Sequence, residues 1–223
     1  MFFTNFNTAM LPVYICRALA MLLVIPLHES AHAYVSWKLG DSTAKDYGRL
    51  TLNPLRHFDV MGVVCLIVAG FGWAKPVPIG ANRFRNPKVG MALSAAAGPV
   101  SNFLFAYVSI ILWKLVAFGL YYPLGNNGLY NFLCLFFQIL TIMNITLAVF
   151  NMLPVPPLDG SRIFLVFLPQ RLYFKIMQYE RYIMLALFVL LFIGVLDTPL
   201  GVINNFVFNL LDKGSGFIDA MFF

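Results

Sequence analysis

The sequence predicts an all-α polytopic membrane protein with a three-helix core and one or two apolar helices toward the C-terminus. Hydrophobic residues make up 61% of the chain and charged residues only 11%, which is typical of a membrane protein rather than a soluble domain. Three apolar segments, residues 8–39, 89–120 and 129–152, are long enough to cross a bilayer as helices. We expect one membrane domain over residues 1–223, with a core at about 8–165 and the further helices at about 170–223.

The first predicted helix, residues 8–39, carries a proline in its inner half. Pro26 removes a backbone hydrogen bond and is expected to kink the helix, which should end at Gly40. Residues 1–10 lack the basic stretch of a cleaved signal peptide, so this span is expected to remain in the protein.

The region 41–86 is rich in glycine, proline and charge. Within it, residues 60–71 are apolar but too few to span a bilayer. Basic residues flank this stretch, Arg56 before it and Lys75 after it, which indicates that it enters and leaves on one side. The sequence therefore predicts a short re-entrant or β-hairpin-like segment between the first two helices.

The second and third helices differ in how they begin and end. The second opens with small residues at 92–98, which let membrane helices pack closely, and its Asn102 is expected to bond across that packing. The third stops before a proline-rich stretch that begins at Pro154. Beyond it, residues 182–196 are short for a span, and residues 199–211 either return through the membrane or lie at its interface.

Charge sets the predicted orientation. The net charge is +6, but the basic residues lie in short loops, so they indicate topology rather than nucleic-acid binding. Residues 38–88 hold eight Lys and Arg and residues 162–181 hold four, whereas residues 121–131 and the first nine residues hold none. We therefore expect an integral membrane protein with its N-terminus outside and both basic loops in the cytoplasm. Arg17 and Lys114, in outer halves of helices, are expected to snorkel.

The segment His28-Glu29-Ser-Ala-His32 carries the strongest functional pattern. On a helix, residues i and i+4 share a face, so His28 and His32 can bind one zinc ion while Glu29 reaches a water beside it. The chain holds only three histidines and two glutamates, and ionisable residues in a membrane are costly unless they function.

Asp159 is the expected third ligand of this metal. His28 lies about 20 residues into its helix, roughly 30 Å from the outer end, so it should lie near the cytoplasmic edge of the bilayer. The third helix ends at a similar depth, and Asp159-Gly160 follows it directly. A catalytic zinc usually has three protein ligands and one open position; the other interpretation is that Asp159 only turns a loop.

At this point the chain resembles the site-2 protease family of intramembrane zinc metalloproteases. The resemblance rests on residues 28–32, on 151–160 and on 97–102, and covers about residues 10–165. It implies one zinc ion held by His28, His32 and Asp159, with Glu29 as general base and Asn151 helping to bind the substrate carbonyl. Residues 48–59 look like the compact prokaryotic branch, and this resemblance implies a protein of the prokaryotic inner membrane. No PDZ or CBS domain fits in the chain.

The expected reaction is hydrolysis of peptide bonds within or near transmembrane segments of membrane proteins. Zinc lowers the pKa of a bound water to about 7, and Glu29 would take its proton. Asn151 could instead cap its helix. Residues 71–80 are either an edge strand that pairs with an unwound substrate or a structural loop.

Other functions stay open on sequence alone. A metal-ion transporter would show polar residues across the membrane depth, and a pseudoprotease would bind clients without cutting them. A zincin with a glutamate ligand is disfavoured, because no glutamate lies between Glu29 and Glu180. His57, with Asp59, is either a fourth metal contact or a loop residue near the headgroups, and the three cysteines are expected to be buried thiols. The oligomeric state is not predicted.

Overall fold

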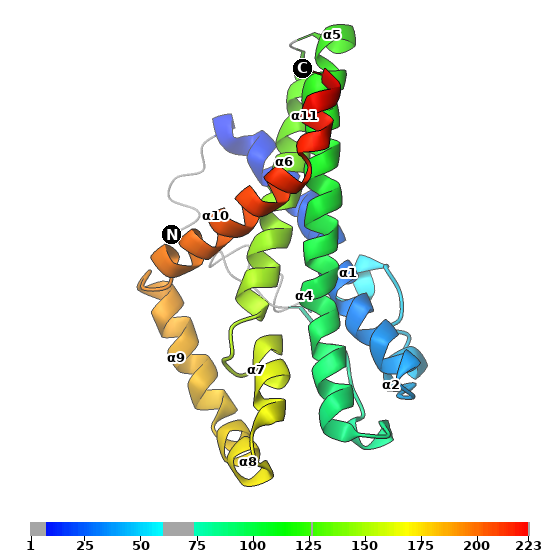
Figure 1. The fold of residues 1–223 in the computed structure, drawn as a ribbon, viewed down its shortest axis with the longest axis vertical. Coiled ribbons are helices and arrows are strands. Elements are labelled where there is room, and N and C mark those ends of the chain that lie inside the picture. The colour runs from blue at the N-terminus through cyan, green and yellow to red at the C-terminus, as the bar shows by residue number, and fades with distance from the viewer. Residues whose placement is uncertain (1–7, 60–73, 126, 223) are drawn as a thin grey trace.

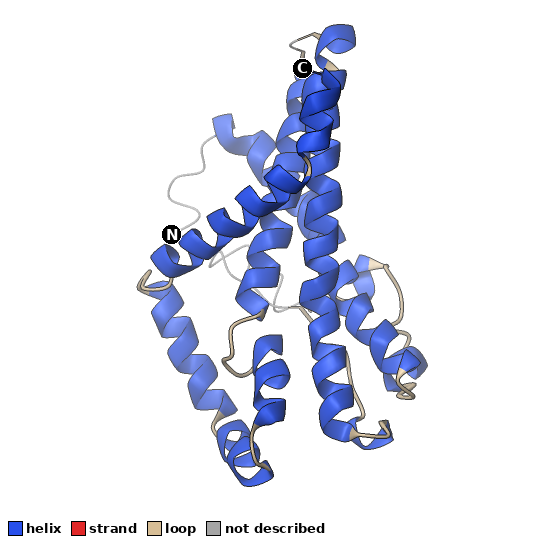
Figure 2. Cartoon of the chain, in the orientation of Figure 1, coloured by secondary structure: helices blue, strands red, loops and turns tan. Residues whose placement is uncertain are grey.

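The structure, a computed structural model, describes residues 8–59, 74–125 and 127–222. The described residues contain helices and turns but no β-strand (Figure 2). The all-helical fold class predicted from the sequence is therefore confirmed for this part of the chain.

Three long helices form the core. They are α1 (Leu11–Lys38), α4 (Pro87–Lys114) and α6 (Gly128–Asn151), and all three are long and apolar enough to cross a membrane. A 3-10 turn (Thr8–Met10) precedes α1, and a π-helical turn (Leu115–Gly119) extends α4 to α5 (Tyr121–Leu124). The three helices agree closely with the predicted segments, and α4 packs against both others (Figure 1).

Small side chains line the contacts between these helices. Ala20 of α1, Ala95 of α4 and Ala106 of α4 are at most 2% exposed. Leu23 and Leu104, on the same helices, are 46% and 64% exposed. This distribution suits a membrane, where helices associate by close packing of small residues and large apolar residues face lipid.

Asparagine caps start two of the core helices. The Asn86 side chain accepts a hydrogen bond from the Val89 N–H, and Asn127 accepts one from the Tyr130 N–H. Both caps satisfy a backbone donor that the first turn of a helix leaves free.

In the described residues between α1 and α4 the helices are all short: α2 (Thr43–Asp46), η2 (Pro54–Arg56) and η3 (Ala81–Arg83). The predicted re-entrant segment, residues 60–71, lies outside the described residues. Its two flanks meet: Phe58 and Ala74 form an antiparallel bridge, and the Lys75 N–H donates to the His57 carbonyl at 2.8 Å. The two flanks of this stretch therefore lie side by side.

The C-terminal region is divided more finely than the one or two helices predicted. After α7 (Asp159–Phe164) and the 3-10 turn Leu165–Phe167 come α8 (Gln170–Gln178), α9 (Glu180–Phe192), α10 (Asp197–Gly214) and α11 (Gly216–Phe222). Helices α9 and α10 are bent by 84° at a short break, and together they are long enough for one further crossing. Gly194, with φ of 76°, lies in this break and allows a backbone conformation that other residues rarely adopt.

Helix α10 lies across α4 and α6. Leu200, Val207, Phe208 and Leu211 pack on a buried cluster of Ala106, Ile145 and Val149. At its far end, Lys114 of α4 contacts the carboxylates of Asp212 and Asp219 at 2.9 and 2.7 Å, and its side chain is only 3% exposed. The expectation that Lys114 snorkels was wrong, because two aspartates 98 and 105 residues away supply its counter-charge.

Candidate metal centre

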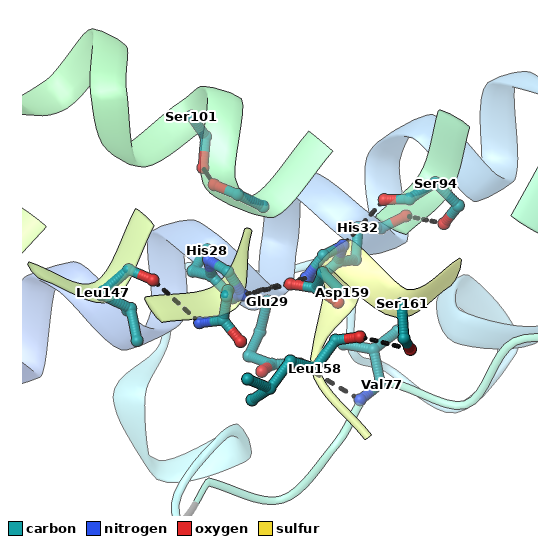
Figure 3. A network of polar contacts seen from close by, with 12 residues as sticks. His28, Glu29, His32, Val77, Ser94, Ser101, Leu147, Leu158, Asp159 and Ser161 are labelled. Carbon is teal, nitrogen blue, oxygen red and sulfur yellow. Dashed lines mark hydrogen bonds and ion pairs between the residues drawn. The ribbon is translucent and has the colours of Figure 1, made fainter. Parts of the chain in front are cut away.

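The side chains of His28, His32 and Asp159 converge in one cluster (Figure 3). One helical turn separates the two histidines on α1, and their Nε2 atoms lie 3.0 Å apart. Asp159, the first residue of α7, brings its Oδ2 to 3.1 Å from His28 Nε2 and 3.3 Å from His32 Nε2. Both histidines are buried, at 5% and 6% exposure.

These three atoms have the spacing that a tetrahedral zinc site requires. Zinc binds histidine nitrogen and carboxylate oxygen at about 2.0–2.1 Å, which puts neighbouring ligand atoms about 3.3 Å apart. The observed triangle, with edges of 3.0, 3.1 and 3.3 Å, matches that value, so the residues fit a zinc ion. No other group of three or more such residues occurs within the described part of the chain.

A backbone carbonyl orients His32. Its Nδ1 lies 2.7 Å from the Ser94 carbonyl oxygen of α4, and since a carbonyl only accepts, Nδ1 carries the proton. The Nε2 lone pair is then free for a metal, which is the usual arrangement for ligating histidines. The hydroxyls of Ser94 and Ser36, both fully buried, bond each other at 2.5 Å and tie α4 to α1 beside this contact.

Gly98 lets α4 approach both ligands. A Cβ at this position would collide with the His32 ring and come within 2.5 Å of His28 Cε1. The sequence predicted close packing from the small residues at 92–98, and this glycine gives that packing its function. Any larger residue would push α4 away or displace the histidine rings.

Tight turns place Asp159 at the start of α7. The Val155 N–H bonds the Leu153 carbonyl and the Leu158 N–H bonds the Val155 carbonyl. A Cβ at Gly160 would come within 2.5 Å of the Met152 carbonyl carbon, so the chain packs directly against the end of α6. Burial alone would raise the pKa of the Asp159 carboxyl, but hydrogen bonds and charge from His28 and His32 lower it below its usual range. The carboxylate form, which binds metals, is favoured.

Glu29 lies beside this cluster but is not part of it. Its Oε2 accepts a hydrogen bond from the Val77 N–H at 3.2 Å (Figure 3), and the side chain is partly buried. Val77 belongs to segment 74–80, in which Ala74 bridges Phe58 and residues 75–80 have no regular secondary structure. Pro76 and Pro78 favour an extended backbone in this segment. The segment singled out as an edge strand or structural loop therefore lies against the predicted general base.

The remaining predicted polar residues are not part of the ligand cluster. Asn151 donates its side-chain N–H to the Leu147 carbonyl of its own helix at 3.1 Å. Asn102 is fully buried, yet neither of its amide atoms has a hydrogen-bond partner among the residues that the structure describes, so the bond expected across the helix packing is not seen there. His57 is also fully buried; its Nε2 contacts the Thr51 carbonyl at 2.7 Å, which ties the loop together.

Two positioning contacts were not predicted from the sequence. The Ser94 carbonyl and the Val77 N–H are backbone groups, so no side-chain type marks them. The prolines at 76 and 78, which favour an extended backbone in the residues before them, were the available signal for the second contact.

The fold and the site define a class of protein. A helical membrane chain in which a His-Glu-x-x-His helix meets an aspartate from a later segment has the architecture of a membrane-embedded zinc metalloprotease.

Comparison with known proteins gives the family: the chain belongs to peptidase family M50, the site-2 protease family. The family model matches residues 126–194, which include α6 and Asp159. The chain is 40% identical to the "Putative zinc metalloprotease YwhC" of Bacillus subtilis over 82% of its own length and 80% of that protein.

More distant relatives are longer. The chain is 27% identical to the "Putative zinc metalloprotease Rip2" of Mycolicibacterium smegmatis, and 28% identical to the Mycobacterium tuberculosis (strain Erdman) protein of the same name. Each match covers 66% of this chain and 55% of the relative. No solved structure matches the chain.

Proposed function

We propose that this chain hydrolyses peptide bonds within or near the membrane-spanning segments of other membrane proteins. The observation that carries the proposal is the triangle of ligand atoms from His28, His32 and Asp159, with Glu29 on the same helix turn. Family membership supports the peptidase activity, and the position of the site on apolar helices supports a substrate within the membrane.

His28, His32 and Asp159 would hold one zinc ion, which supplies a Lewis acid for the scissile carbonyl and lowers the pKa of water. Glu29 accepts a proton from the attacking water and then delivers it to the leaving amine nitrogen. The peptide C–N bond breaks, and the products are a carboxylate and an amine. The Asn151 amide, at the end of α6 next to this region, is proposed to turn from the Leu147 carbonyl to the substrate carbonyl oxygen.

The extended segment 74–80 would receive the substrate. A transmembrane helix hides its peptide bonds, so it must unwind before it is cut. An unwound chain can pair with an extended segment through backbone hydrogen bonds, and this segment lies directly beside Glu29. Pairing there would bring the scissile bond next to the general base.

The test is cleavage of a single-span substrate by the purified protein in detergent. We expect Glu29→Gln to reduce the cleavage rate by about 10²–10⁴-fold, the contribution typical of a general base, while the protein keeps its zinc. The matched control is Glu180→Gln, at the start of α9, which changes the chain's other glutamate and should retain activity.

Zinc measurements separate the alternatives. Activity that is lost with a chelator and restored by zinc supports the proposal. A zinc-loaded wild type that cuts no substrate in a panel of spans would contradict it in favour of a pseudoprotease, and zinc flux into vesicles would indicate a transporter.

A further inference from the structure

A cavity lies in the loop region between α1 and α4, apart from the three metal-ligand residues. The cavity measures about 450 Å³. Three basic residues, Arg49, Arg56 and Lys75, line it together with neutral ones: Tyr47, Leu55, Phe58, Pro76 and Pro78.

The charge in this cavity is unbalanced. None of the described lining residues is acidic, although Asp59 follows the lining residue Phe58 in the chain. Arg49 is only 7% exposed, and its guanidinium donates a hydrogen bond to the Arg56 carbonyl. Within the described residues, none of the three cations forms an ion pair. A nearly buried charge without a counter-charge is costly, so the cavity suits an anion.

A smaller apolar cavity of about 310 Å³ adjoins the same loop. It is lined by residues of α1 (Leu27, Ser30, Ala31 and Tyr34) and by Leu50, Thr51 and Leu52. The loop 49–56 thus contributes to both cavities. Leu52 and Leu55 on this loop are 63% and 84% exposed. Such exposed apolar side chains suit a loop that lies against lipid.

We propose that the basic cavity binds the phosphate group of an anionic phospholipid, with an acyl chain of that lipid in the neighbouring apolar cavity. A phosphate ester offers the acceptor oxygens that guanidinium and ammonium groups bind most strongly. Basic loop clusters beside membrane helices are a common basis for recognition of anionic headgroups.

A lipid fits this site better than an acidic substrate peptide. The cavity lies in the basic loop that the charge distribution places on the cytoplasmic side. By the same rule, the cytoplasmic flanks of substrate spans are basic, so the cavity would repel them. A free anion would make no use of the apolar cavity on the same loop, whereas an acyl chain of a lipid would fill it.

The site is connected to the HExxH helix. The Ser30 hydroxyl donates to the Thr51 carbonyl at 2.5 Å, so the loop is tied to α1. Lys75, Pro76 and Pro78 line the cavity, and Val77 between them contacts Glu29. A bound headgroup would therefore steady the segment that lies against Glu29, although the lipid site itself does not depend on the proposed protease activity.

The experiment measures lipid binding by the full chain in uncharged detergent, from the shift in its melting temperature and by native mass spectrometry. The probes are phosphatidylglycerol, phosphatidylcholine and inorganic phosphate. We expect phosphatidylglycerol, but not phosphatidylcholine, to raise the melting temperature. Arg49→Gln and Lys75→Gln should each weaken phosphatidylglycerol binding about tenfold, the loss expected for one charge-assisted contact.

The control is Arg171→Gln, which removes an exposed charge from α8 outside the cavity and should bind like the wild type. If Arg49→Gln does not fold, Lys75→Gln carries the test, because Lys75 is exposed. If inorganic phosphate alone raises the melting temperature, the ligand is a free phosphate and the lipid proposal is wrong. Equal binding of phosphatidylglycerol and phosphatidylcholine would contradict the proposal. Equal losses of phosphatidylglycerol binding in Lys75→Gln and Arg171→Gln would contradict it as well.

Discussion

At the scale of single residues, the candidate metal centre depends on contacts that leave no room for larger side chains. Gly98 packs against both histidine rings, and Gly160 packs against the backbone at the end of α6. The Ser94 carbonyl then sets the tautomer of His32. The ligand geometry is therefore imposed by α4 and the α6–α7 turn as much as by the histidine helix.

Gly98→Ala is predicted to impair zinc binding and cleavage together. In an ordinary helix this change stabilises by about 0.5–1 kcal/mol, but here the new methyl group collides with the His28 and His32 rings. Overpacking of this kind typically costs about 1–3 kcal/mol. Zinc content and cleavage rate of the purified variant test the prediction.

Gly201→Ala is the matched control, since a Cβ there meets nothing within 4 Å. It should keep full zinc and activity. A Gly98→Ala protein with wild-type zinc content and cleavage would show that α4 does not constrain the ligands.

The sequence predicted the ligand residues of the site better than the contacts that position them. The i, i+4 spacing put His28 and His32 on one face, and matched helix depth pointed to Asp159; the structure brings these three together. Backbone contacts such as the Ser94 carbonyl have no residue signature. Lys114 was misjudged because its partners, Asp212 and Asp219, are remote in sequence.

At the scale of elements, residue spacing alone did not predict the contact of the extended segment 74–80 with Glu29 or the bend between α9 and α10. The segment's prolines indicated an extended backbone, but its contact with Glu29 depends on how the loop folds back onto α1. The apolar pattern of 182–211 gave no angle between its helices, and the 84° bend arises at a break in which Gly194 has positive φ.

Val77→Pro is predicted to lower cleavage about tenfold, the equivalent of one hydrogen bond. The substitution removes the N–H that binds Glu29, while the neighbouring prolines keep the backbone extended. Val77→Ala keeps the N–H and should cleave nearly as the wild type does. Steady-state rates with one substrate compare the two variants, and equal rates would mean that the Val77 N–H does not contribute.

At the scale of the whole molecule, the helices and charges together predict four crossings with both termini outside. The three core helices give three crossings, and the α9–α10 pair gives the fourth when it is counted as one broken span. The C-terminus lies near α5, at the opposite end of the molecule from α2 and α8 (Figure 1). The apolar segments predicted the first three crossings and the charge count their orientation, whereas the sequence left residues 199–211 either returning through the membrane or lying at its interface.

Cysteine labelling in intact cells measures this topology. Cysteines introduced at Asn127 and Phe217 are predicted to react with a membrane-impermeant reagent, and one at Lys45 should not, in a background without Cys16, Cys65 and Cys134. Lys45 lies in the basic loop and Asn127 in the uncharged one. Labelling at Asn127 but not at Phe217 would contradict a fourth crossing.

The central claim, that His28, His32 and Asp159 hold a catalytic zinc ion, is tested most directly by the zinc content of purified protein. We predict one zinc per chain in the wild type and in Asp46→Ala, which changes an exposed aspartate paired with Arg83. Asp159→Ala should lose its zinc to a mild chelator and lose cleavage with it. An Asp159→Ala protein that retains both zinc and cleavage would contradict the claim.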